Sequence, residues 1–401
     1  AAGHAYALAG VTIATTEAEA GPLPSGREPH SASPARARSA VPPRRIVVPM
    51  VSVDPGDERR GQSMYYGPPP LDGVAKHAPV AAVIDPRGER MLSTHVLATT
   101  WDLRAAECAL PRAIAVDEAS GRGFVACMGI DQVHVVDLAA ADPMAAVIDR
   151  IAVPSGPTGV AVTGDGATMV VFGEHESRLR FVDLGTGENH DVVLPIRASH
   201  ATRRGRELFY ASDDRGISFD GLACASCHPD GGDDGLTWTT PEGPRQTPML
   251  AGRLVGTAPY GWDRGSGDLE AYIVETVRRL RGNGLSSSDL SALASYVERL
   301  PAPPRREAGA LAALGREVFF AQGCASCHED AGGTDRRQHA VEPGTNAVDT
   351  PSLRFVAATA PYFHDGRYAS LESLFTHSKM GSVANLNADQ KGALVAFLES
   401  L

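Results

Sequence analysis

The sequence lacks the features of a membrane-spanning or nucleic-acid-binding protein. No apolar run in its 401 residues approaches the roughly 18 residues that a membrane-spanning helix needs. Positive charge is not in excess, because 37 basic residues stand against 48 acidic ones and the net charge is -11. Such a balance disfavours nucleic acid and anionic lipid as main partners. We expect neither a membrane span nor a nucleic-acid partner.

Cysteine is scarce, and a leader segment is missing. The chain contains six cysteines and opens at Ala1, with no basic segment followed by an apolar one. We therefore expect a mature chain from which a signal peptide has been removed. Its composition, 43% hydrophobic and 21% charged, is that of an ordinary soluble protein, and its length suits about two or three domains.

Four of the six cysteines lie in two identical units with the sequence CASCH, at 224–228 and 324–328. A thioredoxin-like site needs no adjacent histidine, and two disulfides would leave both histidines unexplained. Paired Cys-x-x-Cys units in a structural zinc site usually lie only about 12–20 residues apart. Cys-x-x-Cys-His is the attachment motif of c-type haem. Two thiols one helical turn apart can bond the two vinyl groups of one porphyrin, and the histidine then lies under the iron.

The sequence around the two units is duplicated as well. G-R-E-x-F precedes each unit, and Leu311, Leu314, Val318 and Phe319 have the spacing of an amphipathic helix face. After each unit come T-P-x-L, then T-A-P-Y, then an aromatic turn that ends in aspartate. Trp262-Asp263 occupies this turn in the first copy and His364-Asp365 in the second. We therefore predict two α-helical cytochrome c-like domains, over 200–303 and 304–401.

Residues from about 200 to 401 resemble the bacterial di-haem cytochrome c peroxidase and MauG superfamily. The resemblance is carried by the two CASCH units, by YGWD and by TPSLRFVAATAPYFHDGRYASLESL. It implies two covalently bound haems, with peroxide reacting at the first and electrons passing through the second. The substrate would be a redox partner protein or a protein side chain. Covalent haem attachment implies a periplasmic or extracellular location.

The resemblance also implies roles for individual residues. His228 and His328 become iron ligands, and the four thioether cysteines are Cys224, Cys227, Cys324 and Cys327. In the loop FTHSKMGSVANL, Met380 is the expected second ligand of the C-terminal haem, with His377 as the local rival. A thioether ligand raises the haem potential, which suits electron storage. No tyrosine follows Tyr368, which disfavours the histidine–tyrosine ligation of the MauG branch.

Two further roles follow from the same resemblance. Trp262 matches the family tryptophan between the haems, where it relays electrons, and core filling is the alternative. Thr359 and Pro361 match positions whose carbonyl groups hold an interdomain calcium ion. The family's partner asparagine is missing from MLAGRLVGT.

The peroxide-reacting side departs from the family pattern. Where the family has glutamine, this sequence has Tyr272, and Glu275 is the nearest carboxylate. Glu275 is the candidate acid/base that moves a proton during O–O cleavage. The alternative is a surface ion pair with Arg278 or Arg279. No second ligand of the first haem is obvious, although His190 and His200 lie upstream.

The first half of the chain has the sequence pattern of a β-propeller. Residues 111–138 and 157–184 repeat the order strand, glycine turn, strand, loop and a strand ending in V-D-L, and 79–103 is a shorter relative. Repeats of about 40–50 residues with several strands are typical of propeller blades, here of the YVTN type. We predict all-β, propeller-like blades over 1–199, with a Pro/Ser-rich loop at about 20–45. Because so few blades are apparent, either the propeller is small, or blades are missing from this chain, or an additional chain completes it.

The sequence leaves open whether the two remaining cysteines are bonded and which function the chain has. In an oxidising location Cys108 and Cys127 form a disulfide or remain buried thiols. The favoured function is a di-haem peroxidase or oxidase. The alternative is a non-catalytic electron-transfer module, with both irons six-coordinate, that its propeller anchors in a larger assembly. A purely structural propeller, whose haems have no catalytic or electron-transfer role, is the weakest hypothesis.

Overall fold

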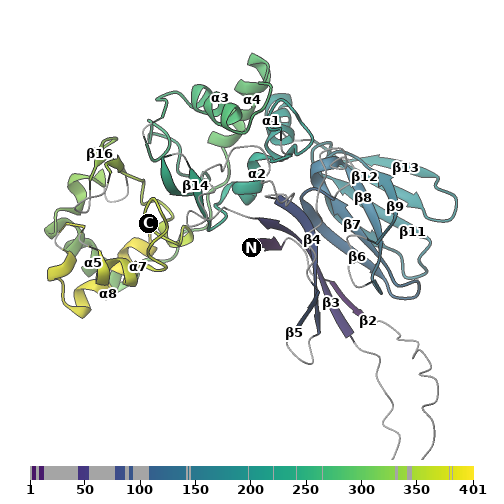
Figure 1. Cartoon of the computed structure of the whole chain (residues 1–401), viewed down its shortest axis with the longest axis horizontal. Helices are drawn as coiled ribbons and strands as arrows, with labels where there is room; N and C mark the ends of the chain where they lie inside the picture. The colour runs from purple at the N-terminus through teal and green to yellow at the C-terminus, as the bar shows by residue number, and fades with distance from the viewer. Residues whose placement is uncertain are drawn as a thin grey trace, which may run out of the picture.

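The computed structural model describes strands at 2–5, 9–12, 44–53, 77–85 and 90–93, and then residues 108–401. Within this last range it leaves out 141–142, 144–145, 197, 220, 241, 264, 330–332, 341–345, 379 and 382. Figure 1 shows β-sheets at one end, a first helical unit in the middle and a second helical unit at the other end. All-β elements followed by helical units were predicted, and this order is confirmed. Most of the predicted loop at about 20–45 lies outside the described residues.

The first sheet is built around one long strand. It contains β1 (Ala2–Ala5), β2 (Ala9–Thr12), β3 (Arg44–Val53), β4 (His77–Asp85) and β5 (Arg90–Ser93). Its order is β1-β3-β4-β5, and β2 also pairs with β3. All the pairings are antiparallel.

Two further sheets are four-stranded antiparallel meanders. The second sheet is β6 (Pro111–Asp117), β7 (Arg122–Cys127), β8 (Gln132–Asp137) and β9 (Val147–Ala152). The third is β10 (Pro157–Val162), β11 (Thr168–Gly173), β12 (Arg178–Asp183) and β13 (Asn189–Val193). The three strands predicted in each long repeat are confirmed. β9 and β13 extend each repeat by a fourth strand that the repeat comparison missed.

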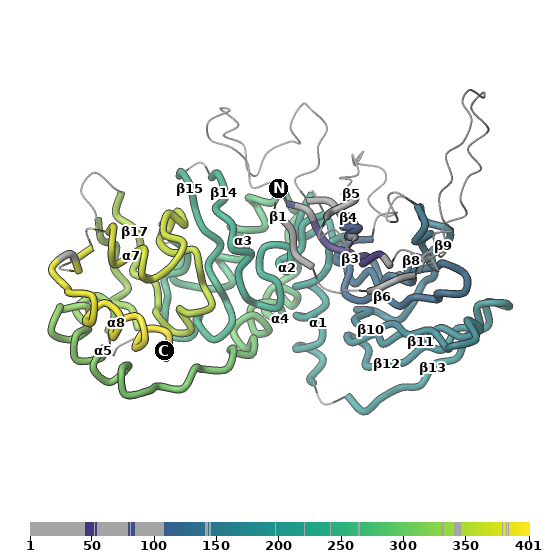
Figure 2. Tube along the Cα trace, turned by 90° about the horizontal axis from the view of Figure 1, so that it is seen from below, coloured from purple at the N-terminus to yellow at the C-terminus, as the bar shows by residue number. Residues whose placement is uncertain are grey.

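The three sheets stack face to face (Figure 2). Val47 of the first sheet packs with Val125 and Val136 of the second. On the opposite face of the second sheet, Phe124 and Val135 share a cluster that includes Met169 of the third. The described strands form separate sheets and do not close into a ring. Stacked blade-like sheets are therefore present, without a closed propeller in this part of the chain.

The two helical units repeat one plan. The first has α1 (His200–Tyr210), α2 (Cys224–Cys227), β14 (Thr237–Thr240), β15 (Gly243–Gln246), α3 (Leu269–Arg279) and α4 (Ser287–Glu298). The second has α5 (Ala310–Ala321), η5 (Cys324–Ser326), β16 (Gln338–His339), β17 (Val348–Asp349), η6 (Val356–Ala358), α7 (Leu371–His377), η7 (Val383–Asn385) and α8 (Ala388–Glu399). In each unit the helix before the CASCH motif packs against the last helix of the unit.

The shared G-R-E-x-F motif forms these helix crossings. A side chain at Gly205 would collide with the Ala292 carbonyl of α4, and one at Gly315 with the Ala393 carbonyl of α8. The helices can approach this closely only because glycine lacks a side chain. One turn further on, Phe209 packs edge-on against Tyr296, as Phe319 does against Phe397 in the second unit.

The predicted apolar face of α5 is partly wrong. Leu311 and Leu314 are 50% and 56% exposed. The buried face instead contains Ala312, Gly315 and Phe319. Small residues were undervalued in the sequence pattern, because close helix contact buries glycine and alanine in place of leucine.

The sheets and the first helical unit share one hydrophobic core. Val51 and Val53 of β3 lie in the same buried cluster as Leu208 and Phe209 of α1. Met128, which follows β7, belongs to this cluster too. One buried cluster of the described residues therefore spans residue 199, beside the two clusters that lie between the sheets.

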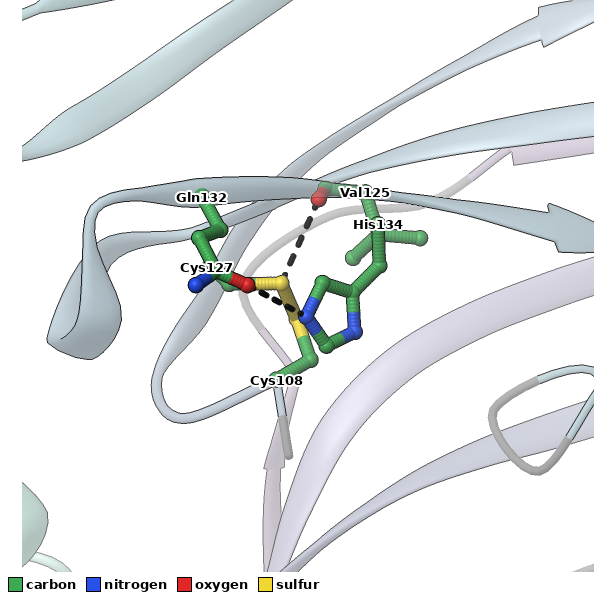
Figure 3. Close-up of a disulfide and its surroundings, with 5 residues drawn as sticks. All are labelled: Cys108, Val125, Cys127, Gln132 and His134. Atoms are coloured by element: carbon green, nitrogen blue, oxygen red, sulfur yellow. Dashed lines mark hydrogen bonds between the residues drawn. A yellow bond between two sulfur atoms is a disulfide. The ribbon is translucent and has the colours of Figure 1, made fainter. Parts of the chain in front are cut away.

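Cys108 and Cys127 form a disulfide, which answers the question that the sequence left open. Figure 3 shows His134 beside it. The Cys127 sulfur lies 3.3 Å from the Val125 carbonyl oxygen, and His134 Nε2 lies 3.2 Å from Gln132 Oε1. The bond ties the segment before β6 to the end of β7.

Gly315→Ala should destabilise the second helical unit. The added methyl group must displace α5 from the Ala393 carbonyl, and overpacking of this kind costs about 1–3 kcal/mol. The matched control is Gly392→Ala on α8, where a side chain meets nothing within 4 Å. The control should stabilise the protein by about 0.5–1 kcal/mol through helix propensity. Chemical denaturation measures both, and equal effects would contradict the crossing.

Stability should fall as pH drops from about 6.5 to about 4. Burial lowers the pKa of His134 and of His175 to about 4. The unfolded chain takes up protons on these rings in this window while the folded chain does not, so acid favours unfolding. Each ring contributes about 2 kcal/mol between pH 7 and pH 5.

The readout for this prediction is the slope of unfolding free energy against pH. His175→Gln should flatten the slope, whereas the same change at the exposed His377 should not. An unchanged slope in the His175 variant would show that this ring is protonated in the folded protein.

Candidate functional site

Each CASCH unit folds as one tight turn. In α2, the His228 amide donates to the Cys224 carbonyl over 2.9 Å. In η5, the His328 amide donates to the Cys324 carbonyl over 3.0 Å. The same bond thus closes both turns. The four cysteines in these turns are free of disulfides.

The histidine rings of the two turns are fixed by backbone carbonyls. His328 Nδ1 lies 3.1 Å from the Pro351 carbonyl oxygen. His228 Nδ1 lies 3.3 Å from that of Gly232, and the Pro248 carbonyl also acts on this ring. A carbonyl can only accept, so Nδ1 carries the proton in both rings and Nε2 keeps its lone pair. Pro248 and Pro351 are the duplicated prolines of T-P-x-L, so this repeat supplies the carbonyls.

Burial sets the protonation of the two turns. It lowers the pKa of His228 and of His328 to about 4, so both rings are neutral near pH 7. Burial also raises the pKa of Cys224 to about 12 and raises that of Cys324. Neutral imidazoles, which can ligate a metal, and cysteines that are not in disulfides fit a covalently attached haem.

Met380 lies near the second turn. It packs against the buried cluster of the second unit, which Cys324 and Ala325 also contact. Its backbone amide donates to Ser378 Oγ over 2.9 Å. The rival His377 is exposed, and its Nδ1 lies 3.0 Å from the Ser373 carbonyl of its own helix. Of the two candidates, Met380 packs against this cluster and His377 binds its own helix.

Gln246 joins the two helical units. Its amide donates to the His364 carbonyl over 2.6 Å, and its side-chain Nε2 donates to the Thr359 carbonyl over 3.0 Å. Its own carbonyl accepts from Trp262 Nε1 over 2.8 Å. Sequence reasoning missed this residue. Its position directly before the duplicated T-P was the available signal.

Trp262 lies at the boundary between the two units. Its ring meets that of His364 edge to face, with centroids 6.3 Å apart, and its carbonyl accepts from the Asp349 amide over 2.8 Å. The two matched aromatic turns therefore face each other. His364 is buried, its pKa is lowered by that burial, and its Nδ1 has no partner among the described residues.

The calcium expectation fits poorly. The Thr359 carbonyl already accepts from the Gln246 amide group. A calcium ion needs about six to eight oxygen ligands, and here a nitrogen donor lies against one of the two expected ones. We derive no step through calcium.

Tyr272 docks α3 on the tryptophan turn. A side chain at Gly261 or Gly265 would collide with its ring. Burial raises the pKa of this phenol, so it stays neutral. Glu275 follows three residues later, on the same side of the helix, and its charge also acts on Tyr272. Glu275 is half-buried, and the ion pairs found between described residues do not join it to Arg278 or Arg279.

The upstream histidines occupy other places. His190 stacks on Phe181 in the third sheet, with ring centroids 4.7 Å apart. His200 begins α1 with an exposed side chain. No described contact directs either ring toward the first CASCH turn.

These features are those of a c-type cytochrome: a Cys-x-x-Cys-His turn whose half-buried, neutral histidine is held by a carbonyl. The family model for cytochrome c matches residues 312–401. The chain is 28% identical to the methylamine utilization protein MauG of Methylorubrum extorquens over 273 residues, which are 49% of this chain and 76% of that protein. With the cytochrome c551 peroxidase of Nitrosomonas europaea it shares 24% identity over 294 residues, 55% of this chain and 87% of that protein.

These matches support the di-haem cytochrome c peroxidase and MauG superfamily for the second half of the chain. At the level of that family, they support an oxidoreductase with covalently bound c-type haem. A solved MauG-like protein associated with microbial copper homeostasis is 20% identical, with a TM-score of 0.42, over 52% of this chain and 91% of that one. Among the described residues, no helix is long and apolar enough to cross a membrane.

Met380→Ala should remove the weak sulfur-to-iron absorption at the red end of the oxidised spectrum and lower one haem potential. The matched control is His377→Ala, which should change neither, because that ring is bound to its own helix. Optical spectra and redox titration of the haem-loaded protein measure both. A red band that survives in the Met380 variant would remove this methionine from the ligand set.

Proposed function

We propose that the chain is a periplasmic or extracellular di-haem oxidoreductase that uses peroxide. Both CASCH turns would hold haem, with peroxide reacting at the first and electrons passing through the second. The observation that carries this proposal is the matched pair of turns, each with its histidine Nδ1 on a backbone carbonyl, joined by one Trp262–Gln246–His364 contact. A single-haem electron carrier would need neither the second turn nor the joint.

The chain's own residues would orient the two groups. Bound haem supplies an iron centre that exchanges electrons and, where one coordination position is open, reacts with peroxide. Cys224, Cys227, Cys324 and Cys327 would attach the two porphyrins, with His228 and His328 as iron ligands. Because a backbone carbonyl holds Nδ1 of each ring, the orientation of the ring is fixed and Nε2 would be available as the iron ligand. Met380 would complete the ligation of the second iron. The first iron would have an open coordination position.

Trp262 would carry electrons between the two units. Its indole N–H is held by the Gln246 carbonyl, and its ring meets His364 from the other unit. The bond from the Asp349 amide to the Trp262 carbonyl fixes the same turn from the second unit. A ring held from both sides keeps its position when its charge changes, which favours a relay over a simple filler.

Glu275 would move the proton that O–O cleavage requires. Its half-buried carboxylate lies one turn from Tyr272, which anchors α3 against the tryptophan turn. A carboxylate can take a proton from peroxide and return it to the departing oxygen. Tyr272, neutral and buried, would hold the helix in place.

The substrate would be a redox partner protein or a protein side chain, either tryptophan or tyrosine. The relatives named for methylamine utilization and for cytochrome c551 peroxidase support these two classes. The sheets would dock the partner, and an additional chain would complete their stack.

Electron transfer without catalysis is the second candidate. It is favoured by Tyr272, which fills the space at the tryptophan turn where the family has glutamine. Both irons would then be six-coordinate, and the sheets would anchor the cytochrome in an assembly.

Optical and EPR spectra before and after one equivalent of peroxide test the function. A high-spin ferric signal that peroxide converts to a new species is expected for an open first iron. Two low-spin haems that ignore peroxide, both oxidised and half-reduced, would favour the electron-transfer module and overturn the peroxide chemistry.

The same experiment tests Glu275. Glu275→Gln should slow the reaction with peroxide by about a hundredfold, the usual size of a proton-transfer contribution, with an unchanged resting spectrum. The matched control is Glu298→Gln on the exposed side of α4, which should leave the rate unchanged. Equal rates in all three proteins would show that another group moves the proton.

A further inference from the structure

One face of the third sheet is apolar across its strands. The register pairs Val170 with Phe181 and Phe172 with Leu179, and Leu179 and Phe181 in turn oppose Val192 and His190. Residues directly opposite on antiparallel strands point to the same face. We call these six residues, Val170, Phe172, Leu179, Phe181, His190 and Val192, the outer face of the third sheet.

The outer face is turned away from the second sheet. The alternate residues Met169, Val171 and Val182 are the ones that pack against the second sheet. Val170, Phe172, Leu179 and Phe181 are only half-buried and belong to none of the buried clusters in the described part of the chain. Val192 is 43% exposed.

The second sheet shows what such a face normally meets. Sheets cover both of its sides, and β7 is accordingly buried along its length from Gly123 to Cys127. The equivalent strand β11 has the same continuous apolar sequence, TMVVFG, but only every second residue is buried. An uninterrupted apolar run is typical of a strand covered on both faces. The third sheet is therefore built for a cover that the described residues do not provide, and it stands at the end of the stack (Figure 2).

The paired charges Arg178, Arg180 and Asp191 lie on the other face of the third sheet. Arg178 and Arg180 bind Asp191 there, with N–O distances of 2.7–2.9 Å. At the rim of the outer face, Asp183 accepts from the amides of Gly185 and Thr186 and so stays with its own turn. Two copies of the outer face can meet without opposing like charges, which makes the face complementary to itself.

We propose that the outer face of the third sheet binds the same face of a second copy of this chain and forms a two-fold dimer. The occupant that the stack requires is another sheet of this repeat, and a second copy offers one. A two-fold axis places the identical apolar patch on both sides and closes the assembly, the commonest arrangement of homo-oligomers. Exposed apolar patches that run over several strands mark such interfaces. The second copy would be the additional chain that the proposed function invokes. The dimer does not depend on the peroxide chemistry.

Val192→Asp tests the dimer in the haem-loaded full chain. The change puts a charge on each side of the interface, and burying unpaired charges should raise the dimer dissociation constant by at least about a hundredfold. The matched control is Val193→Asp. Val193 is the next residue of the same strand, is 62% exposed, and pairs with Arg178 on the opposite face. Sedimentation velocity across a wide range of protein concentration measures the association of all three proteins.

The expected result is a wild-type dimer, a dimeric Val193 variant and a monomeric Val192 variant. Near-ultraviolet circular dichroism and the haem spectrum should be the same in all three, because both changes are on the surface. A wild-type protein that stays monomeric at every concentration would overturn the proposal. A dimer that both variants retain would place the interface elsewhere and overturn it as well. Either failure leaves the peroxide result unaffected.

Discussion

The hydrogen bond from each CASCH histidine to a backbone carbonyl is the constraint on which the functional half depends. It fixes which ring nitrogen carries the proton and leaves Nε2 for a metal. It also explains why T-P-x-L is duplicated along with the cysteines, since Pro248 and Pro351 supply carbonyls to the two rings. Burial then keeps both imidazoles neutral, so the ligand and its support come from one local arrangement that occurs twice.

The two arrangements are joined through backbone groups more than through charges. Gln246 binds the second unit with both its amide groups while its carbonyl holds the indole of Trp262. Such bonds are short, directional and insensitive to salt, so they hold two aromatic rings at a fixed distance. The same glutamine lies on the carbonyl that the family resemblance assigns to calcium, and the protein thereby bridges its two units with its own side chain.

The sheets are part of the same structure as the first helical unit. Val51 and Val53 share a core with Leu208 and Phe209, so the sheets cannot move independently of the helix that leads to the first CASCH turn. Arg112 of β6 reinforces this junction, because it binds Asp230, two residues after His228, over 2.6 Å. At its far end, the stack stops at a sheet whose outer face is apolar. The sheets thus link the first CASCH turn to an apolar surface.

The sequence by itself determined the covalent chemistry and the repeats. Cys-x-x-Cys-His, T-P-x-L and the V-D-L strands are local patterns, and short-range geometry requires each of them, so the CASCH turns and most strands of the second and third sheets were predictable. Only the tertiary structure decided which residues meet across these units. It showed the Cys108–Cys127 disulfide, the role of Gln246, the burial of Gly315 in place of Leu311 and the shared core at residue 199. These depend on contacts between segments far apart in the chain, and no local pattern encodes how closely two helices or two sheets approach.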